Sequence, residues 1–428
     1  MSSMRFGVNY VPSKNWWYSW VDWDRQIIND DFAAISALGC DHIRVHCLWT
    51  LVQPNPSMVS ATMLARLREM LDVADSNGLD VVVTVLDGWL SGFDFRPSWL
   101  PQSVSIFANP DAITAQEYLL TEMAARIVDH PRFLGFDVAN EPNVLMESGL
   151  NRTTSAQGDA WVSRLLAHCQ QLAPGKLHSV GMDHRPWLTS SEAFSRTTLA
   201  TAGTVTPIHA WVYFTGALER YGPQGTGTTW LARYMIELAI AHHTDPKRQV
   251  WLQEFGMSST WAAPEIVARF PREVLTTLDT TEVWGATWWS SHDISTSLGG
   301  FLPLEHDLGL LSVDNKVKPA GAAFQEAVSA ARSLPPSPSD ESRVGLVLPT
   351  ETEPGLTFAD AFFALVDRGV RPAVVLQARA HDAEYLRKRG VSRLVSPTSA
   401  ETLSASDYPS LNDSPDVAEA RLTSYTPA

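Results

Sequence analysis

The feature that most constrains the fold is a regular alternation of short apolar, β-branched runs with longer amphipathic segments between Arg5 and about Ala331. Such alternation is typical of repeated strand–helix units that build a parallel sheet. The expected strands are 5–11, 42–49, 80–86, 133–140, 177–182, 206–214, 249–255 and 284–290. Eight strands in phase with about eight helices favour a closed (β/α)8 TIM barrel over an open doubly wound sheet.

The helices expected between these strands end at ordinary stop signals, such as Asn77-Gly78 and Pro174-Gly175. Their expected ranges are 24–38, 60–76, 110–129, 155–172, 229–243, 264–278 and 319–333. The segment 183–202 has no clear full helix. No Gly-x-Gly-x-x-Gly follows the first strand and no phosphate-loop motif is present, so nucleotide-binding folds lose their main support.

The composition divides the chain into a barrel domain followed by a linker, a small unit and a tail. Residues 1–332 are the expected barrel domain, and 333–341 has the Pro/Ser composition of a linker. Residues 342–398 predict a small α/β unit with three strands, and the Ser-, Pro- and Asp-rich stretch 399–428 predicts a poorly ordered tail. Because three strands bury little surface, we expect the unit to pack on the barrel or on a neighbouring subunit, which makes a homo-oligomer possible.

The charge of the chain excludes several classes of partner. Its net charge is −15, from 47 acidic and 32 basic residues, without a basic run that would bind phosphate backbones. No stretch approaches the length of apolar sequence that a membrane span needs, and the N-terminus does not resemble a secretory signal. Cys40, Cys47 and Cys169 show no metal-ligand or redox spacing. We therefore expect a cytoplasmic protein that binds neither nucleic acid nor membrane.

Two glutamates follow strands on opposite sides of the expected barrel. The fourth strand ends in Asn140-Glu141-Pro142, and the seventh ends in Glu254-Phe255-Gly256. In such barrels, catalytic residues lie at the carboxyl ends of the strands, so both side chains should reach the same rim. Each glutamate alone could simply bind a loop amide or a basic neighbour. A facing pair, however, is what acetal hydrolysis needs: one acid protonates the leaving oxygen and the other stabilises or captures the oxocarbenium-like carbon.

With these two motifs in place, the chain resembles the retaining glycoside hydrolases of clan A, and the barrel is most similar to glycoside hydrolase family 5. The opening FGVNYVPSKNWW, the turn Asp87-Gly88-Trp89 and the added C-terminal unit resemble the family's actinobacterial and bifidobacterial β-mannosidase-like branch. The resemblance covers roughly residues 4–330 well and the C-terminal part more loosely.

The resemblance implies that Glu141 is the general acid/base and Glu254 the nucleophile, with carboxyl oxygens about 5–5.5 Å apart. Partial burial and the second carboxylate should help to keep Glu141 protonated. Arg44 matches the family's arginine beneath the nucleophile, and Glu254 or Asp137 could balance its charge. Asn140 would donate a hydrogen bond to the 2-hydroxyl of the sugar.

Further substrate-binding residues are expected on the last strands. Alternation along the sixth strand places His209, Trp211 and Tyr213 on one face. The family often has tyrosine two residues after the histidine, so either Trp211 or Tyr213 could contact the nucleophile. On the eighth strand only one of Trp288 and Trp289 can face inward, and we prefer Trp289 as the platform for a sugar ring. Trp89 is a further rim candidate. Nothing in the sequence indicates a metal or another cofactor.

These observations predict a retaining β-glycosidase that hydrolyses short β-linked oligosaccharides, and the resemblance favours an exo-β-mannosidase. A polymer does not enter the cytoplasm, and long loops after the third and eighth strands could close one end of the cleft. The alternatives are a β-glucosidase or β-glucanase with the same catalytic pair, or a sugar-binding protein without activity.

Overall fold

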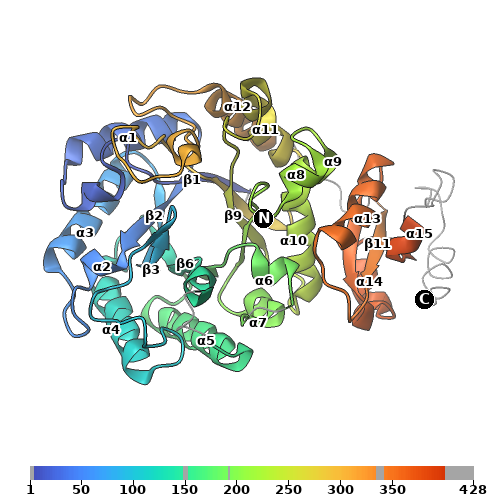
Figure 1. Cartoon of the computed structure of the whole chain (residues 1–428), viewed down its shortest axis with the longest axis horizontal. Coiled ribbons are helices and arrows are strands. Elements are labelled where there is room, and N and C mark those ends of the chain that lie inside the picture. Colours follow the sequence, from blue (N-terminus) through green and yellow to red (C-terminus); the bar gives the residue numbers. More distant parts are fainter. Residues whose placement is uncertain (1–3, 148–152, 191–192, 334–341, 401–428) are drawn as a thin grey trace.

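The computed structural model describes residues 4–147, 153–190, 193–333 and 342–400. Within these residues, eight parallel strands form a barrel surrounded by helices (Figure 1). The barrel strands are β1 (Arg5–Asn9), β2 (His42–Leu48), β3 (Asp80–Asp87), β6 (Phe133–Asn140), β7 (Leu177–Gly181), β8 (Thr206–His209), β9 (Val250–Phe255) and β10 (Val283–Trp288). The (β/α)8 architecture predicted from the alternating pattern is confirmed.

The strands are hydrogen-bonded in the order β7-β6-β3-β2-β1-β10-β9-β8, which leaves β7 and β8 as the last pair to meet. They meet closely, since a Cβ on Gly181 of β7 would lie 2.9 Å from Nε2 of His209 at the end of β8. The Thr204 N–H, just before β8, also donates to the His178 carbonyl of β7 at 2.9 Å. The sheet therefore comes close to full closure at the point where His209 emerges.

The long helices begin at side-chain caps that the sequence supplies. Asp24 caps the helix that starts at Arg25, Asn109 caps the helix that starts at Pro110, and Thr154 forms a capping box with Gln157 at the start of the helix from Ser155. The helices that alternate with the strands are α1 (Arg25–Ala37), α3 (Ala61–Ser76), α4 (Pro110–Ile127), α5 (Ser155–Leu172), α10 (Leu231–His242), α11 (Pro264–Leu275) and α12 (Pro319–Ser333). Between β7 and β8 the described residues form two short helices, α6 (Arg185–Leu188) and α7 (Arg196–Thr201).

The sixth strand is shorter than predicted. It ends at His209, and the next residues turn, with the Thr215 N–H donating to the Trp211 carbonyl and the Gly216 N–H to the Tyr213 carbonyl. Gly216 has a φ of 79°, a conformation that favours glycine. The predicted extension to residue 214 is wrong, and His209, Trp211 and Tyr213 do not share one strand face.

The C-terminal unit is a three-stranded parallel sheet with helices. It contains β11 (Arg343–Leu348), α13 (Leu356–Asp367), β12 (Pro372–Leu376), α14 (Ala383–Lys388), β13 (Val391–Val395) and α15 (Pro397–Ala400), with β11 central. Most of the predicted linker, residues 334–341, and most of the predicted tail, residues 401–428, lie outside the described residues.

This unit packs against α10 of its own barrel, beside which it lies in Figure 1. The Tyr234 ring of α10 contacts Phe358, Phe362 and Phe363 of α13, and its hydroxyl donates to the Pro354 carbonyl at 2.5 Å. Almost every residue of α10 is buried as a result.

A buried ionic cluster joins the same two parts. Glu237 of α10 contacts the guanidinium groups of Arg233, Arg343 and Arg389, and Arg233 also contacts Glu282 at 2.6 Å. These five residues belong to α10, the turn before β10, β11 and the C-terminal end of α14. The apolar contacts and these ion pairs together fix the unit to the barrel.

In the described part of the chain, no helix combines the length and apolar composition that crossing a membrane requires.

Candidate active site

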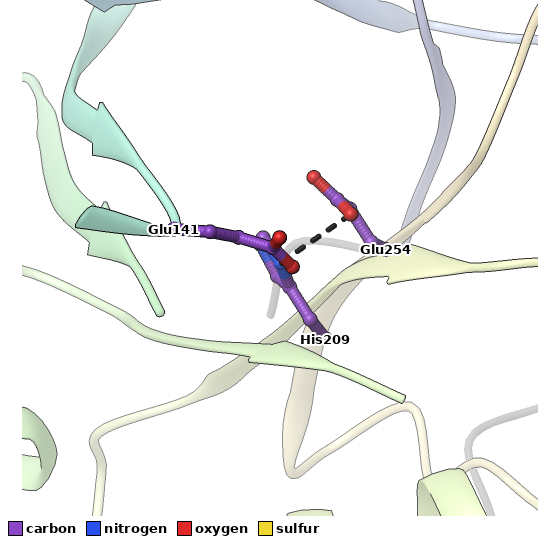
Figure 2. Close-up of side chains that lie close together, drawn as sticks. All are labelled: Glu141, His209 and Glu254. Carbon is purple, nitrogen blue, oxygen red and sulfur yellow. Dashed lines mark hydrogen bonds and ion pairs between the residues drawn. The ribbon is translucent and has the colours of Figure 1, made fainter. Parts of the chain in front are cut away.

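The two glutamates picked out by the sequence meet at the carboxyl ends of the strands. Glu141 directly follows β6, and Glu254 is the fifth residue of β9. Glu141 adopts a φ of 40°, which is unusual for a residue with a side chain, and its N–H donates to the Gly181 carbonyl at 2.7 Å. Figure 2 shows the two side chains reaching toward each other, with His209 beside them.

The spacing of these groups falls near the range of retaining enzymes. One ligand-type atom from each of Glu141, His209 and Glu254 can be chosen so that all three lie within 4.8 Å of one another. Carboxyl groups of retaining glycosidases are about 5–5.5 Å apart, whereas those of inverting enzymes are about 6.5–9.5 Å apart to admit a water molecule. The arrangement is therefore suited to direct attack by one carboxylate.

Arg44 lies beneath the pair with no exposed surface. Its guanidinium donates to Glu254 at 2.7 Å and to Asp137 at 2.7 and 3.0 Å. Both acidic residues that were expected to balance its charge therefore pair with it. It also donates to Oδ1 of Asn140 at 2.8 Å. The Asn140 side-chain N–H₂ in turn donates to the Trp89 carbonyl at 2.8 Å. Arg44 thus holds Glu254 and Asn140 in place together.

The second oxygen of Glu254 is held by Trp211. The Trp211 indole N–H donates to Oε2 of Glu254 at 3.1 Å. Tyr213 lies apart from this contact, because the chain turns after His209; its ring is half exposed and stacks on Trp261 at 4.8 Å. Of these two candidates, Trp211 is the one that contacts Glu254.

His209 connects the two carboxyl groups. Its Nδ1 lies 2.8 Å from Oε1 of Glu141 and 3.3 Å from Oε2 of Glu254. Its Nε2 lies 2.8 Å from Oε1 of Gln253. Burial by itself favours the neutral ring, but the carboxylates of Glu254 and Glu141 outweigh it and raise the pKa of His209.

The same contact changes the expected protonation of the pair. Burial favours neutral Glu141, yet the hydrogen bond and charge of His209 hold the pKa of Glu141 below its usual value. Burial raises the pKa of Glu254, and the charge of Glu141 adds to this effect. The contact with His209 thus opposes the effect of burial, which was expected to favour protonated Glu141. A proton on Nδ1 of His209 would face Oε1 of Glu141, which lies 2.8 Å from Nδ1, and its transfer to that oxygen would give the acid.

The two tryptophans of the eighth strand face opposite ways. Trp288 packs on Phe255 and Phe270 and donates its indole N–H to the Leu308 carbonyl at 2.9 Å. Trp289 follows the strand and contacts Trp211, His46 and Trp16. The preference for Trp289 as the inward-facing ring agrees with this placement.

An aromatic cluster joins three of the loops that follow barrel strands. Trp17 contacts Phe93 and Phe95 from the loop after β3 and Phe301 from the loop after β10, with ring centroids 4.8–5.0 Å apart. Trp89, proposed as a rim residue, begins β4 (Trp89–Leu90), and its described contact with the site is the carbonyl that accepts from Asn140.

Three buried groups near the site were missed by sequence reasoning. Glu305, in the loop after β10, interacts electrostatically with Glu141 and Glu254. Burial raises its pKa to about 7, although the side chains of Ser91 and Trp289 act in the opposite direction. His46 and Asp87 form a buried pair at 2.7 Å beside Trp289. Asp87 and His46 stand at strand ends and could have been found by that rule, whereas Glu305 carries no such signal.

The Glu141, His209 and Glu254 cluster also has residue types that bind metals. However, both oxygens of Glu254 already accept hydrogen bonds, one of them from the positively charged Arg44. That charge would oppose a cation at the same place. The donor set therefore suits a catalytic pair better than a metal centre.

Comparison with known proteins gives a consistent result. A family model described as cellulase (glycosyl hydrolase family 5) matches residues 4–174. No match is found among curated protein sequences.

Similar solved structures extend over nearly the whole chain. A glutamate-to-alanine variant of a GH5_18 protein from Streptomyces cattleya, in complex with Manβ1-4GlcNAc, is 37% identical with a TM-score of 0.88, covering 93% of this chain and 100% of that one. A GH5_18 protein from Bifidobacterium longum subsp. infantis is 32% identical with a TM-score of 0.87, covering 94% and 100%. A variant from Bifidobacterium longum subsp. longum, also with Manβ1-4GlcNAc, is 32% identical with a TM-score of 0.84, covering 92% and 96%. The chain therefore belongs to glycoside hydrolase family 5.

Proposed function

We propose that the protein is a retaining exo-β-mannosidase that releases mannose from short oligosaccharides such as Manβ1-4GlcNAc. The observation that carries the proposal is the facing pair of Glu141 and Glu254 at one barrel mouth, with atoms within 4.8 Å. The choice of sugar draws support from the similar Streptomyces cattleya and Bifidobacterium longum structures, which hold Manβ1-4GlcNAc.

In the first step Glu254 attacks the anomeric carbon while Glu141 gives its proton to the departing oxygen. A covalent mannosyl ester forms as the glycosidic bond breaks. In the second step Glu141, now ionised, removes a proton from water, and the water oxygen displaces Glu254. The Arg44 guanidinium at 2.7 Å stabilises the carboxylate that leaves.

The sugar would be oriented by groups around this pair. One N–H of the Asn140 amide donates to Trp89, which leaves the other for the 2-hydroxyl of the sugar. Trp289 offers an aromatic face beside Trp211, suited to the apolar face of a mannose ring.

The exo mode rests on the aromatic cluster at the barrel mouth. Trp17, Phe93 and Phe301 join the loops after β1, β3 and β10 on one side of the site. A chain of sugars would have to displace these packed rings in order to extend in that direction. We also infer a cytoplasmic setting, which agrees with three buried, unpaired cysteines.

Turnover of 4-nitrophenyl β-mannoside, beside the matching β-glucoside and β-galactoside, tests the substrate. The mannoside should be the best substrate. Turnover of the glucoside without the mannoside would overturn the choice of sugar and leave the catalytic pair standing. Sugar binding without turnover of any glycoside would instead indicate a binding protein.

The nucleophile is tested separately with Glu254→Ala. The variant should lose turnover by a factor of at least about 10⁴ while still binding the disaccharide. Azide should restore activity with formation of the α-mannosyl azide, because the small anion attacks from the side that Glu254 occupied. Unchanged turnover would refute the assignment.

A further inference from the structure

Gln253, which precedes Glu254, is fully buried and faces the active site because of a bulge in β9. Between β8 and β9 the register passes from the pair Ile208 and Leu252 directly to the pair His209 and Glu254, which leaves Gln253 as the extra residue. Adjacent residues on a regular strand point to opposite faces, and a bulge is what re-aims a side chain. Gln253 and Glu254 can therefore both approach His209.

The Gln253 side chain contacts the nitrogen of His209 that faces away from the glutamates. Its Oε1 lies 2.8 Å from Nε2 of His209. The same oxygen is packed against Gly181, where a Cβ would lie only 2.1 Å from it. A flipped amide would push its N–H₂ group against this backbone methylene, whereas an oxygen is tolerated there. Oε1 is therefore the acceptor, and Nε2 of His209 carries a hydrogen.

This contact decides where the second hydrogen of the ring can be. When His209 is neutral, Nδ1 has a lone pair, and it faces Oε1 of Glu141 at 2.8 Å. A lone pair opposite a carboxylate is unfavourable, so a proton is needed between the two atoms. The proton lies either on Nδ1, as an imidazolium, or on Glu141, as the carboxylic acid.

We propose that Gln253 is a positioning residue that fixes the hydrogen of His209 on Nε2 and thereby makes the Glu141–His209 pair retain the proton that the first step consumes. The proposal rests on the proposed function only in treating Glu141 as the general acid.

Other charged or titratable groups also surround His209. Glu254, on the neighbouring strand, lies 3.3 Å from Nδ1, and Arg44 of β2 opposes a positive ring. His46 of β2 and His184 after β7 interact with the ring electrostatically as well, and burial favours the neutral form of both. None of these four groups changes when Gln253 is replaced, so the substitution isolates the contact at Nε2.

Two substitutions should move the basic limb of the kcat/KM pH profile in opposite directions, since that limb reports loss of the acid's proton. In Gln253→Met the acceptor is gone, so neutral His209 can carry its hydrogen on Nδ1 and donate to ionised Glu141. The pair then loses its proton more easily, and the limb should fall by about one pH unit.

In Gln253→Glu the added carboxylate stabilises the imidazolium. The limb should rise, while the maximal rate falls because the proton stays on His209.

The measurement uses the full-length protein and whichever 4-nitrophenyl glycoside the wild type hydrolyses, so it remains decisive if the sugar is not mannose. The matched control is Gln249→Met, immediately before β9, where the amide donates to the Thr281 carbonyl at 3.4 Å. The basic limb of this control should not move. A 2,4-dinitrophenyl glycoside, which leaves with little protonation, should lose less rate in both Gln253 variants.

Opposite shifts of the limb in the two Gln253 variants would support the proposal. Equal losses of rate with an unmoved limb would overturn it and leave Gln253 as a packing residue. Shifts in the same direction would also overturn it, because they would show a general disturbance of the site.

Discussion

At the scale of single residues, Trp211 holds one oxygen of Glu254 through an N–H bond of 3.1 Å. A hydrogen bond to a charged group contributes about 1.5–3 kcal/mol. Trp211→Phe should therefore lower kcat/KM about tenfold to a hundredfold. Because the indole favours the carboxylate, its loss should also raise the pKa of Glu254 further and move the acid limb of the profile to higher pH.

The matched control is Trp261→Phe, a tryptophan nearby that stacks on Tyr213 rather than bonding to Glu254. Its acid limb should stay in place. If both variants shift the limb equally, the effect comes from the aromatic surroundings and not from the hydrogen bond.

Glu305 gives a prediction for the pH dependence of stability. Burial raises its pKa from 4.5 to about 7, so the native state retains a proton that the unfolded chain loses. The free energy of unfolding should fall as the pH rises from about 4.5 to 7 and then stay level. Glu305→Gln removes this penalty and should raise stability at pH 8 by about 3 kcal/mol, with little change at pH 4.5.

Asp307→Asn is the control for Glu305, since it lies in the same loop but with the opposite shift. The N–H of Ser259 and the Lys318 ammonium outweigh burial and lower the pKa of Asp307. The negative charge of Asp307 stabilises the native state when the pH is above the ordinary pKa of aspartate. This stabilisation is lost as the pH falls through the lowered pKa of Asp307. The control should therefore be destabilised at pH 8. Chemical denaturation at both pH values would decide, and a Glu305→Gln effect independent of pH would contradict the account.

The candidate catalytic residues found from sequence are those fixed by strand position. Glu141 and Glu254 stand at strand ends, so the barrel rule placed them without knowledge of any contact. Gln253 and Glu305 depend on a bulge and on the path of a long loop, which leave no periodic signal in the sequence. The contact between His209 and Glu141 was also missed, because it joins residues at the ends of two different strands.

At the scale of elements, α10 joins the barrel to the C-terminal unit, and Glu237 is its central charge. Burial opposes ionisation, but Arg343, Arg233 and Arg389 lower the pKa of Glu237 and keep it charged. Glu237→Gln removes the carboxylate that the three arginines share and should lower the free energy of unfolding by about 3–5 kcal/mol. Loss of the Glu237 charge should loosen the C-terminal unit before the barrel unfolds.

Unfolding in denaturant, monitored by limited proteolysis, would measure this effect. Glu384→Gln makes the same change in an exposed pair with Lys388 and should leave the unfolding midpoint unchanged. Equal midpoints for the Glu237 variant and the wild type would show that apolar packing alone holds the unit.

The elements themselves were largely predictable, because periodicity and caps are local properties. The predicted ranges of α5 and α12 match the structure, and the strands differ by a few residues at their ends. The error in β8 has a clear cause. Alternating aromatic residues continue past His209 as they would in a strand, but Gly216 and the turn bonds bend the chain away.

At the scale of the whole molecule, a homo-oligomer through the C-terminal unit stays a prediction. The unit is small, but α10 of its own barrel already covers part of its apolar surface, as the contacts of Tyr234 show. Light scattering at several concentrations would report a multiple of 47.2 kDa if subunits associate. A mass of one chain throughout would contradict this prediction without affecting the proposed activity.

The proposed activity is the hydrolysis of a β-mannoside by Glu141 and Glu254 with retention. Hydrolysis of Manβ1-4GlcNAc followed by proton NMR tests the sugar and the stereochemistry together. We expect free mannose to appear first as the β anomer and to equilibrate later with the α anomer. Release of α-mannose first, or an intact disaccharide in the presence of an active enzyme, would contradict the account.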